Sequence, residues 1–217
     1  PRGSSFRWRG RAYTIKVGGV FNVANAVAAA TCAAGLGIAP DAIDSGLAAV
    51  ESVPGRFQLV DAGQPFAVVV DYAHTPDGLA KVLEAARQIC AGRLVAVFGA
   101  GGDRDREKRP LMGATAARLA DLVLVTSDNP RSEDPDRIIA EVLSGAAEAG
   151  NVQADPDRAA AIATALATAA PGDVVVIAGK GHEKGQEIAG RVLPFDDVEV
   201  ATQALRRILD SRQGGGR

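Results

Sequence analysis

Apolar runs and amphipathic segments alternate along most of this sequence. Continuous apolar runs, such as FAVVVD at 66–71, predict buried strands, and each is followed by a segment with apolar residues at helical spacing. The predicted strands are 66–71, 94–98, 122–126 and 174–178, and the predicted helices are 78–90, 110–120, 135–149, 158–170 and 198–209. This pattern indicates a mainly parallel sheet with helices on both faces. We therefore expect an α/β, Rossmann-like, doubly wound domain.

The first part of the chain has a different pattern. Residues 6–17 alternate between apolar and polar side chains, which predicts a strand or hairpin. Apolar residues at helical spacing predict two further helices, at 22–36 and 40–50. The Pro54-Gly55 dipeptide then breaks the chain, so we place a domain boundary between 1–54 and 55–217.

Composition narrows the class of protein. The 217 residues carry 24 Lys and Arg against 26 Asp and Glu, and this near balance gives no reason to expect nucleic-acid or anionic-membrane binding. No apolar run approaches the ~18 residues of a membrane span, and no signal peptide is visible. Cys32 and Cys90 lie in apolar helical patterns, which favours core thiols over a disulfide. We expect a soluble cytoplasmic protein, and the start without methionine suggests a piece of a longer chain.

Polar loops follow directly after each of the four predicted core strands. They are 71–77, 99–109, 127–131 and 179–184, whereas the loops at the opposite ends of the strands are short and plain. Ligands of parallel α/β sheets bind at the carboxyl ends of the strands. The sequence therefore predicts a ligand site at this edge of the sheet.

The glycine-rich loop 99–109 follows neither the dinucleotide-binding nor the P-loop pattern. Its cations Arg104, Arg106, Lys108 and Arg109 are interleaved with acids. We expect about half of them to be solvated, and one or two to meet a carboxylate or phosphate.

The two histidines, His74 and His182, also lie in these polar loops rather than on apolar faces, which favours a functional role. No His or Cys cluster has the spacing of a zinc site, so we predict no metal bound by protein ligands alone.

The string Asp128-Asn129-Pro130-Arg131 is the most specific of these features. Proline restricts the turn, and an acid, an amide and a guanidinium then lie within four residues. Arg can bind a carboxylate with two hydrogen bonds, while Asp and Asn oxygens can accept from an ammonium. This combination suits a zwitterionic amino-acid head group. The alternative is a helix-capping turn before Pro135.

Six strings together resemble Mur ligases of the UDP-N-acetylmuramoyl-tripeptide synthetase type, in order and over nearly the whole chain. They are FNVAN from Phe21, VPGRFQLV from Val53, VVDYAHTPDGL from Val69, FGAGGDRDREKRPLMG from Phe98, SDNPRSEDP from Ser127 and AGKGHEKGQ from Ala178. The resemblance implies that 55–217 is the family's third domain and 1–54 the end of its central ATPase domain. The family's P-loop, modified lysine and UDP-binding domain are not in this sequence, and Glu107 stands where its pattern has glycine.

The resemblance implies an ATP- and Mg²⁺-dependent amide ligase that acts as a monomer. Its substrates would be ATP, meso-2,6-diaminopimelate and UDP-N-acetylmuramoyl-L-alanyl-D-glutamate, and this chain alone would be inactive. The residues that match the family's nucleotide and catalytic positions are Asn22, Asn25, Arg56, Asp71 and His74. Those that match its diaminopimelate contacts are Arg104, Asp128, Asn129, Pro130, Arg131, Gly179 and Glu183.

Two other interpretations remain open at this point. The chain could belong to another amide ligase of the same superfamily, one that adds lysine or extends folate with glutamate; the Asp128–Arg131 string argues against this. It could also be a non-catalytic amino-acid-binding module, which the candidate nucleotide residues disfavour.

Overall fold

The computed structural model describes residues 3–214, with side chains up to residue 211. The chain divides into two compact units, Pro1–Gln58 and Leu59–Arg217. The division falls close to the Pro54-Gly55 dipeptide. Each unit has its own core, and each is described by itself below.

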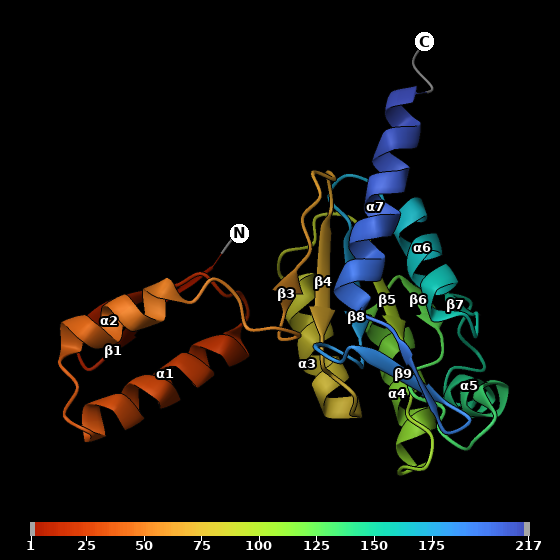
Figure 1. Cartoon of the computed structure of the whole chain (residues 1–217), viewed down its shortest axis with the longest axis horizontal. Helices are drawn as coiled ribbons and strands as arrows, with labels where there is room; N and C mark the ends of the chain where they lie inside the picture. Colours follow the sequence, from red (N-terminus) through yellow and green to blue (C-terminus); the bar gives the residue numbers. More distant parts are fainter. Residues whose placement is uncertain (1–2, 215–217) are drawn as a thin grey trace. The chain divides into compact units, whose positions relative to one another are not determined.

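The first unit, red to orange in Figure 1, is a β-hairpin covered by two helices. Strands β1 (Ser4–Trp8) and β2 (Arg11–Ile15) pair antiparallel, and helices α1 (Val20–Gly35) and α2 (Pro40–Ala49) follow. Tyr13, Ala30 and Ile43 form the small core. The predicted hairpin and both predicted helices are confirmed.

The prediction that Cys32 is a core thiol is wrong, because this residue is exposed. Helix α1 buries Asn22, Ala26 and Ala30, which recur every four residues on one face. Cys32 comes two residues after Ala30, about 200° further around the helix, and so faces away from the core. Cys90 is half-buried, and both cysteines are free.

The second unit is built on a six-stranded sheet with the order β3-β4-β8-β5-β6-β7. The four predicted strands are β4 (Ala67–Asp71), β5 (Leu94–Phe98), β6 (Leu122–Val125) and β8 (Val174–Ala178), and they pair parallel with one another in the order β4-β8-β5-β6. Two short strands that the sequence pattern did not predict, β3 (Gln58–Leu59) and β7 (Val152–Ala154), form the edges. The expected doubly wound α/β domain is confirmed.

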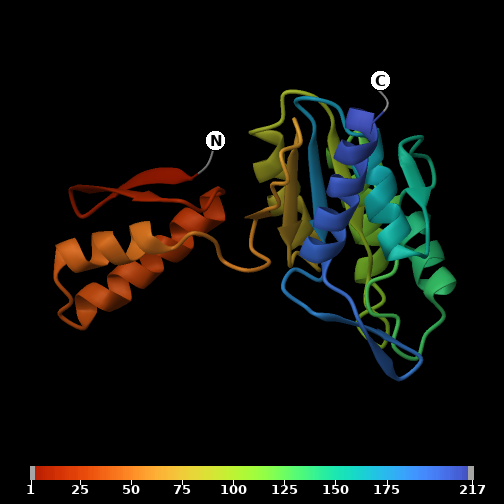
Figure 2. The same cartoon turned by 45° about the horizontal axis from the view of Figure 1, so that its top comes forward.

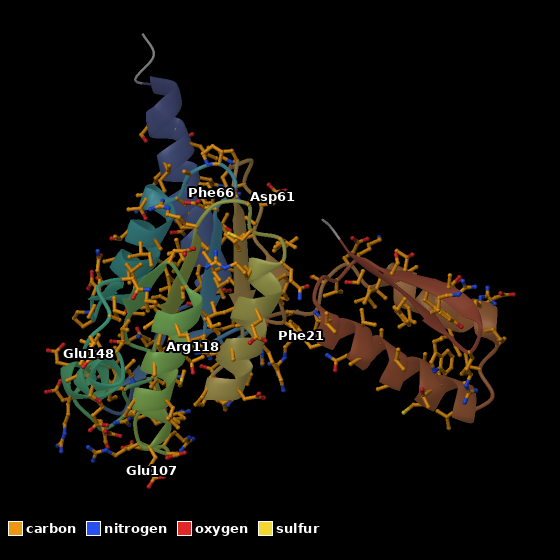
Figure 3. All side chains as sticks on the ribbon, turned by 180° about the vertical axis from the view of Figure 1, so that it is seen from behind. Phe21, Asp61, Phe66, Glu107, Arg118 and Glu148 are labelled. Carbon is orange, nitrogen blue, oxygen red and sulfur yellow. The ribbon has the colours of Figure 1, made fainter. Side chains whose placement is uncertain are left out.

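Helices cover both faces of this sheet. Figure 2 shows α6 (Arg158–Thr168) and α7 (Asp197–Gly214) side by side on one face. Figure 3 shows α3 (Pro76–Arg87) and α4 (Lys108–Leu119) on the other, and α5 (Pro135–Ser144) packs against α4. The five predicted helices are therefore present. No helix among the described residues is long and apolar enough to cross a membrane.

All five predicted helices of the second unit differ from the prediction by a few residues at an end, and α5 and α4 are the two whose local structure is informative. Helix α5 ends at Ser144 rather than at 149, and a Cβ at the next residue, Gly145, would lie 1.8 Å from the Pro110 carbonyl oxygen of α4. Helix α4 begins after Glu107, whose φ of −64° is ordinary helical backbone. A glycine is therefore not required at that position, and the departure from the family pattern does not distort the turn.

A fully buried ion pair joins the start of α6 to the start of α7. Arg158 Nε and Nη2 donate to the two carboxylate oxygens of Asp197 at 2.8 and 2.7 Å. Nη1 and Nη2 also donate to the carbonyl oxygens of Ser127 and Ala178, at 3.2 and 3.0 Å. One guanidinium thus links two helices to the carboxyl ends of β6 and β8.

A second buried guanidinium, that of Arg109, links α4 to α5. It donates to both carboxylate oxygens of Glu133 at 2.8 and 2.9 Å, to Glu141 at 2.8 Å and to the Gly101 carbonyl at 3.1 Å. Arg106 also pairs with Glu141. Two of the four cations of the glycine-rich loop therefore meet carboxylates, as expected, but these carboxylates belong to the protein itself.

We predict that Asp197→Asn destabilises the protein by about 3–5 kcal/mol, because it leaves the Arg158 charge buried without its anion. Replacing both partners by apolar residues, in Arg158→Met/Asp197→Leu, is expected to cost much less. Urea unfolding followed by circular dichroism measures both changes. A double variant as unstable as Asp197→Asn would contradict this account.

The second prediction concerns pH. Hydrogen bonds from Arg109 and from the Asp103 N–H lower the pKa of Glu133 from 4.5 to about 2. A carboxylate with a depressed folded-state pKa contributes stability above its unfolded pKa and loses it as pH falls through the folded value. The free energy of unfolding should therefore fall between pH 4.5 and about 2.

Glu133→Gln should flatten this fall, whereas Glu148→Gln, an exposed residue near the end of α5, should leave it unchanged. Urea titrations across this pH range provide the test. Equal pH profiles for Glu133→Gln and wild type would show that the Glu133 contacts do not stabilise the fold.

Candidate functional site

The four polar loops meet at one edge of the sheet, as the sequence predicts. Strand β8 lies between β4 and β5, and all three run parallel. Their carboxyl ends point the same way, toward the edge where the β9–β10 hairpin lies in Figure 2. This hairpin, β9 (Gly185–Ile188) and β10 (Arg191–Pro194), was not predicted. The candidate site lies in this cluster of loops.

Glycines let the loops approach one another closely. Gly179 has φ of 115°, and a Cβ there would lie 2.5 Å from the Asp128 carboxylate. A Cβ at Gly102 would lie 1.9 Å from the Pro130 carbonyl oxygen. These two glycines therefore allow residues 128–131 to pack closely against the loops 99–109 and 179–184.

Asp128 is a buried carboxylate with charged groups of both signs nearby. Its side chain is 7% exposed, and no hydrogen bond among the described residues ends on its carboxylate oxygens. Burial raises its pKa, while the nearby cations Arg158 and Lys180 act in the opposite direction. The Asp128 carbonyl oxygen accepts a hydrogen bond from Gln186 of β9 at 2.9 Å. The carboxylate oxygens of Asp128 therefore remain open to a hydrogen-bond donor.

Asn129 is held on all sides by the protein. Its Oδ1 accepts from Lys180 Nζ at 2.9 Å and from the Glu187 N–H at 3.0 Å, and its Nδ2 donates to Glu183 Oε2 at 2.8 Å. Both acceptor positions of the amide oxygen are thus occupied. The expectation that this oxygen accepts from a ligand ammonium is therefore corrected: Asn129 has one N–H left to offer.

Arg131 occupies a left-handed backbone conformation, with φ of 55°. Its N–H donates to the Glu187 carbonyl at 2.9 Å, and its own carbonyl accepts from the Ala189 N–H at 2.7 Å. The side chain donates to the Gly102 carbonyl at 2.6 Å and lies 3.3 Å from the Glu187 carboxylate. The β9–β10 hairpin therefore holds both the backbone and the guanidinium of Arg131.

The alternative that this string is only a helix-capping turn is not supported. Helix α5 is capped by Asp134, whose side chain accepts from the Asp136 N–H. Pro130 closes a turn by accepting from the Glu133 N–H at 3.0 Å. The polar side chains of Asp128, Asn129 and Arg131 take no part in the cap.

Arg104 and Arg131 lie on either side of Gly101. A Cβ at that glycine would be 3.0 Å from Arg131 Nη1 and 3.7 Å from Arg104 Cγ. Arg104 is exposed, and its guanidinium donates to the Asp103 carbonyl at 3.1 Å. Two cations from different loops thus lie close to Gly101, at the same edge of the sheet as the loops that carry Asp128 and Glu183.

The loop after β4 brings Asp71 and His74 to the same edge. Asp71 Oδ1 accepts from the Ala73 N–H at 2.8 Å, and the Asp71 carbonyl accepts from the Gly179 N–H at 3.1 Å. The Tyr72 ring lies between the two histidines, 4.7 Å from His74 and 5.4 Å from His182 between ring centroids. The two loops are therefore in direct contact.

Lys108 crosses from the start of α4 to the same loop. Its Nζ donates to the His74 carbonyl at 2.9 Å, and burial lowers its pKa. Of the four cations in the glycine-rich loop, only Arg104 is thus both exposed and without a protein carboxylate partner among the described residues.

The remaining candidates, Asn22, Asn25 and Arg56, belong to the first unit. Asn22 is buried and donates to the Gly18 carbonyl at 2.8 Å, and Asn25 donates to Asn22 at 3.4 Å. Both asparagines line a pocket of about 270 Å³ with apolar walls from Ile15, Val17 and other residues. Arg56 is exposed. Apolar walls with a few amide groups are the setting that a purine ring requires.

Among the described residues, no group of three or more His, Cys, Asp or Glu side chains could hold a metal ion. These residues alone therefore do not form a Mg²⁺ site.

Sequence reasoning missed two groups that shape the site, Lys180 and the Arg158–Asp197 pair. Lys180 lies between two glycines of the predicted polar loop 179–184, but the sequence of that loop does not indicate that the lysine side chain is buried. Arg158 is the first residue of α6, where the helix dipole disfavours a cation. An arginine at this position indicates that an anion elsewhere in the protein compensates its charge.

Comparison with known proteins identifies the family. The family model for "Mur ligase, glutamate ligase domain" matches residues 55–181. The UDP-N-acetylmuramoyl-L-alanyl-D-glutamate--2,6-diaminopimelate ligase of Streptomyces coelicolor is 55% identical over 194 residues, 87% of this chain and 38% of that protein. The ligase of the same name from Aquifex aeolicus is 47% identical over 208 residues, 94% of this chain and 43% of that protein.

Solved structures agree in fold. A structure of a UDP-N-acetylmuramoyl-L-alanyl-D-glutamate--2,6-diaminopimelate ligase matches with a TM-score of 0.69 at 39% identity, over 97% of this chain and 43% of that one. The structure of the MurF ligase of Thermotoga maritima in complex with ADP matches with a TM-score of 0.65 at 22% identity, over 97% of this chain and 44% of that one. At this identity the match supports the fold alone.

This chain spans less than half the length of the ligases that it matches. The family model nevertheless covers more than half of this chain, and the parallel sheet with its loop cluster is the fold of the solved relatives. The chain therefore belongs to the Mur ligase family.

Proposed function

We propose that this chain is the acceptor-binding part of an ATP-dependent ligase that joins meso-2,6-diaminopimelate to UDP-N-acetylmuramoyl-L-alanyl-D-glutamate. The observation that carries the proposal is that two carboxylates, Asp128 and Glu183, and two guanidinium groups, Arg104 and Arg131, belong to loops that meet at one sheet edge. Relatives about half identical in sequence bear the name of this ligase, which supports the same substrate.

The charges suit the far end of diaminopimelate, which carries one ammonium and one carboxylate. The ammonium would lie against Asp128 and Glu183, beside the carbonyl oxygen of Gly179, and the carboxylate would meet the Arg131 and Arg104 guanidiniums. Pro130 holds the turn that directs these groups. L-Lysine has the ammonium but no distal carboxylate, so in a lysine complex the Arg131 guanidinium would keep only its contacts with the Gly102 carbonyl and the Glu187 carboxylate. A lysine complex would therefore lack the charged contact that diaminopimelate would make with Arg131.

We assign the nucleotide side of the reaction to Asn22, Asn25, Arg56, Asp71 and His74. The two asparagines would face the adenine, and the other three would face the remainder of the nucleotide. ATP supplies the activation that a free carboxylate lacks, since phosphorylation converts its oxygen into a leaving group before the acceptor amine attacks. Residues 1–54 would then be the end of a central ATP-binding domain and 55–217 the acceptor domain of a cytoplasmic enzyme that uses Mg²⁺.

Binding to the 217-residue chain is the direct test of the acceptor assignment. Isothermal calorimetry should give a dissociation constant for meso-diaminopimelate at least about tenfold below that for L-lysine, because a charged pair in a partly buried site is worth more than 1.4 kcal/mol. Equal affinity for the two amino acids would refute this proposal.

Arg131→Ala, made in the complete ligase, tests the role of that residue. The variant should raise KM for diaminopimelate by an amount equivalent to about 2–5 kcal/mol and change KM for ATP far less. Arg118→Ala, at an exposed arginine in the last turn of α4, is the matched control and should change neither constant. A larger effect on ATP than on diaminopimelate would show that Arg131 serves the nucleotide instead.

A further inference from the structure

Lys180 is a fully buried lysine in the middle of the acceptor loops. Its side chain has an exposed fraction of 0%, and it lies between Gly179 and Gly181, which both have positive φ values. Glycines on either side let the backbone turn so that the lysine side chain points inward. A buried ammonium is costly unless anions or hydrogen bonds surround it, so its partners indicate what it does.

Those partners are two residues of the proposed acceptor site. Lys180 Nζ donates to Asn129 Oδ1 at 2.9 Å and to Glu183 Oε2 at 3.2 Å. Asn129 Nδ2 donates to the same Glu183 oxygen at 2.8 Å. Lys180, Asn129 and Glu183 thus form a closed triangle of hydrogen bonds. The triangle fixes one oxygen of Glu183 and leaves the other, Oε1, available at a side chain that is 34% exposed.

The ammonium also counters a concentration of negative charge. Glu183 and Asp128 lie close enough that the Glu183 charge raises the pKa of Asp128, which burial has already raised, and Lys180 lowers it. The other charged groups that face Asp128 are Arg158 of α6, Asp197 of α7 and Lys108 of α4. Arg158 acts on Asp128 more strongly than Lys180 does, but Arg158 also pairs with Asp197 at 2.7 Å, whereas Lys180 contacts Glu183 directly at 3.2 Å.

We propose that Lys180 is a positioning residue of the acceptor site: without touching the amino acid, it orients Asn129 and Glu183 and places a positive charge beside the two carboxylates, Asp128 and Glu183, that would face the substrate ammonium. This inference rests on the proposed function. The residues proposed above to bind diaminopimelate would contact it directly. Lys180 would instead act through Asn129 and Glu183.

The test compares three variants of the 217-residue chain. Lys180→Met removes the ammonium and keeps the length of the side chain, and Lys180→Arg keeps the charge. Lys184→Met is the matched control, since Lys184 is 76% exposed and pairs with Asp196 outside the triangle. If Lys180→Met does not fold, Lys180→Gln replaces it, because its amide can still donate to Asn129.

Binding of meso-diaminopimelate is measured by calorimetry at about pH 6 and about pH 8.5. Lys180→Met should weaken binding at least about tenfold, Lys180→Arg should restore a large part of it, and Lys184→Met should match wild type. The loss in Lys180→Met should be greater at the lower pH, because Asp128 without Lys180 takes up a proton more readily as pH falls. An equal loss at both pH values, or no rescue by arginine, would overturn the charge-balancing role.

Amide hydrogen exchange tests the positioning role without any ligand. The Glu187 N–H donates to Asn129 Oδ1, so it should exchange faster in Lys180→Met than in wild type. The Thr126 N–H, which donates to the Phe98 carbonyl inside the sheet, is the internal reference and should not change. Unchanged exchange at Glu187 would overturn the inference.

The two measurements also separate the two proposals. Failure of the wild-type chain to bind diaminopimelate would refute the proposed function, while the exchange experiment would still decide whether Lys180 positions Asn129. Tight binding by wild type with unaltered binding by Lys180→Met would refute the inference and leave the proposed function in place.

Discussion

The buried guanidinium of Arg158 is the interaction on which the arrangement of the second unit depends. It closes two short hydrogen bonds to Asp197 and donates to the carbonyl oxygens of Ser127 and Ala178, the points at which two of the functional loops leave the sheet. Both charges are fully buried, so each requires the other. The position of these loops is thereby coupled to the packing of α6 against α7.

Loop packing around that anchor converts a parallel sheet into a binding site. Gly179 and Gly102 let three loops approach to distances that a Cβ would prevent, and the β9–β10 hairpin then binds the backbone of Arg131 from the outside. Arg109 secures the glycine-rich loop from the other side through Glu133. The consequence is a preorganised set of charges, held by backbone contacts and buried ion pairs rather than by flexible side chains alone.

The polar residues at this edge differ in how far the protein itself uses their hydrogen-bonding groups. Arg104 and Asp128 have no carboxylate or cation in hydrogen-bonded contact among the described residues, whereas both acceptor positions of the Asn129 amide oxygen are occupied by Lys180 and Glu187. The distinction has a consequence for specificity. A zwitterion satisfies both signs of charge at once, and a ligand that lacks one of them leaves an uncompensated group behind.

The sequence alone determined the four central strands, the helices and the sheet edge at which the polar loops meet, because apolar periodicity and chain order are local properties. It also located Asp128–Arg131 and the resemblance to Mur ligases. Only the tertiary structure decided which polar residues pair with one another. Arg158 meets Asp197 at a separation of 39 residues, and Lys180 meets Asn129 at 51, and no local pattern encodes such contacts. The buried partners of a charge depend on how distant loops pack, and that packing is what turned one loop lysine inward and left Arg104 exposed.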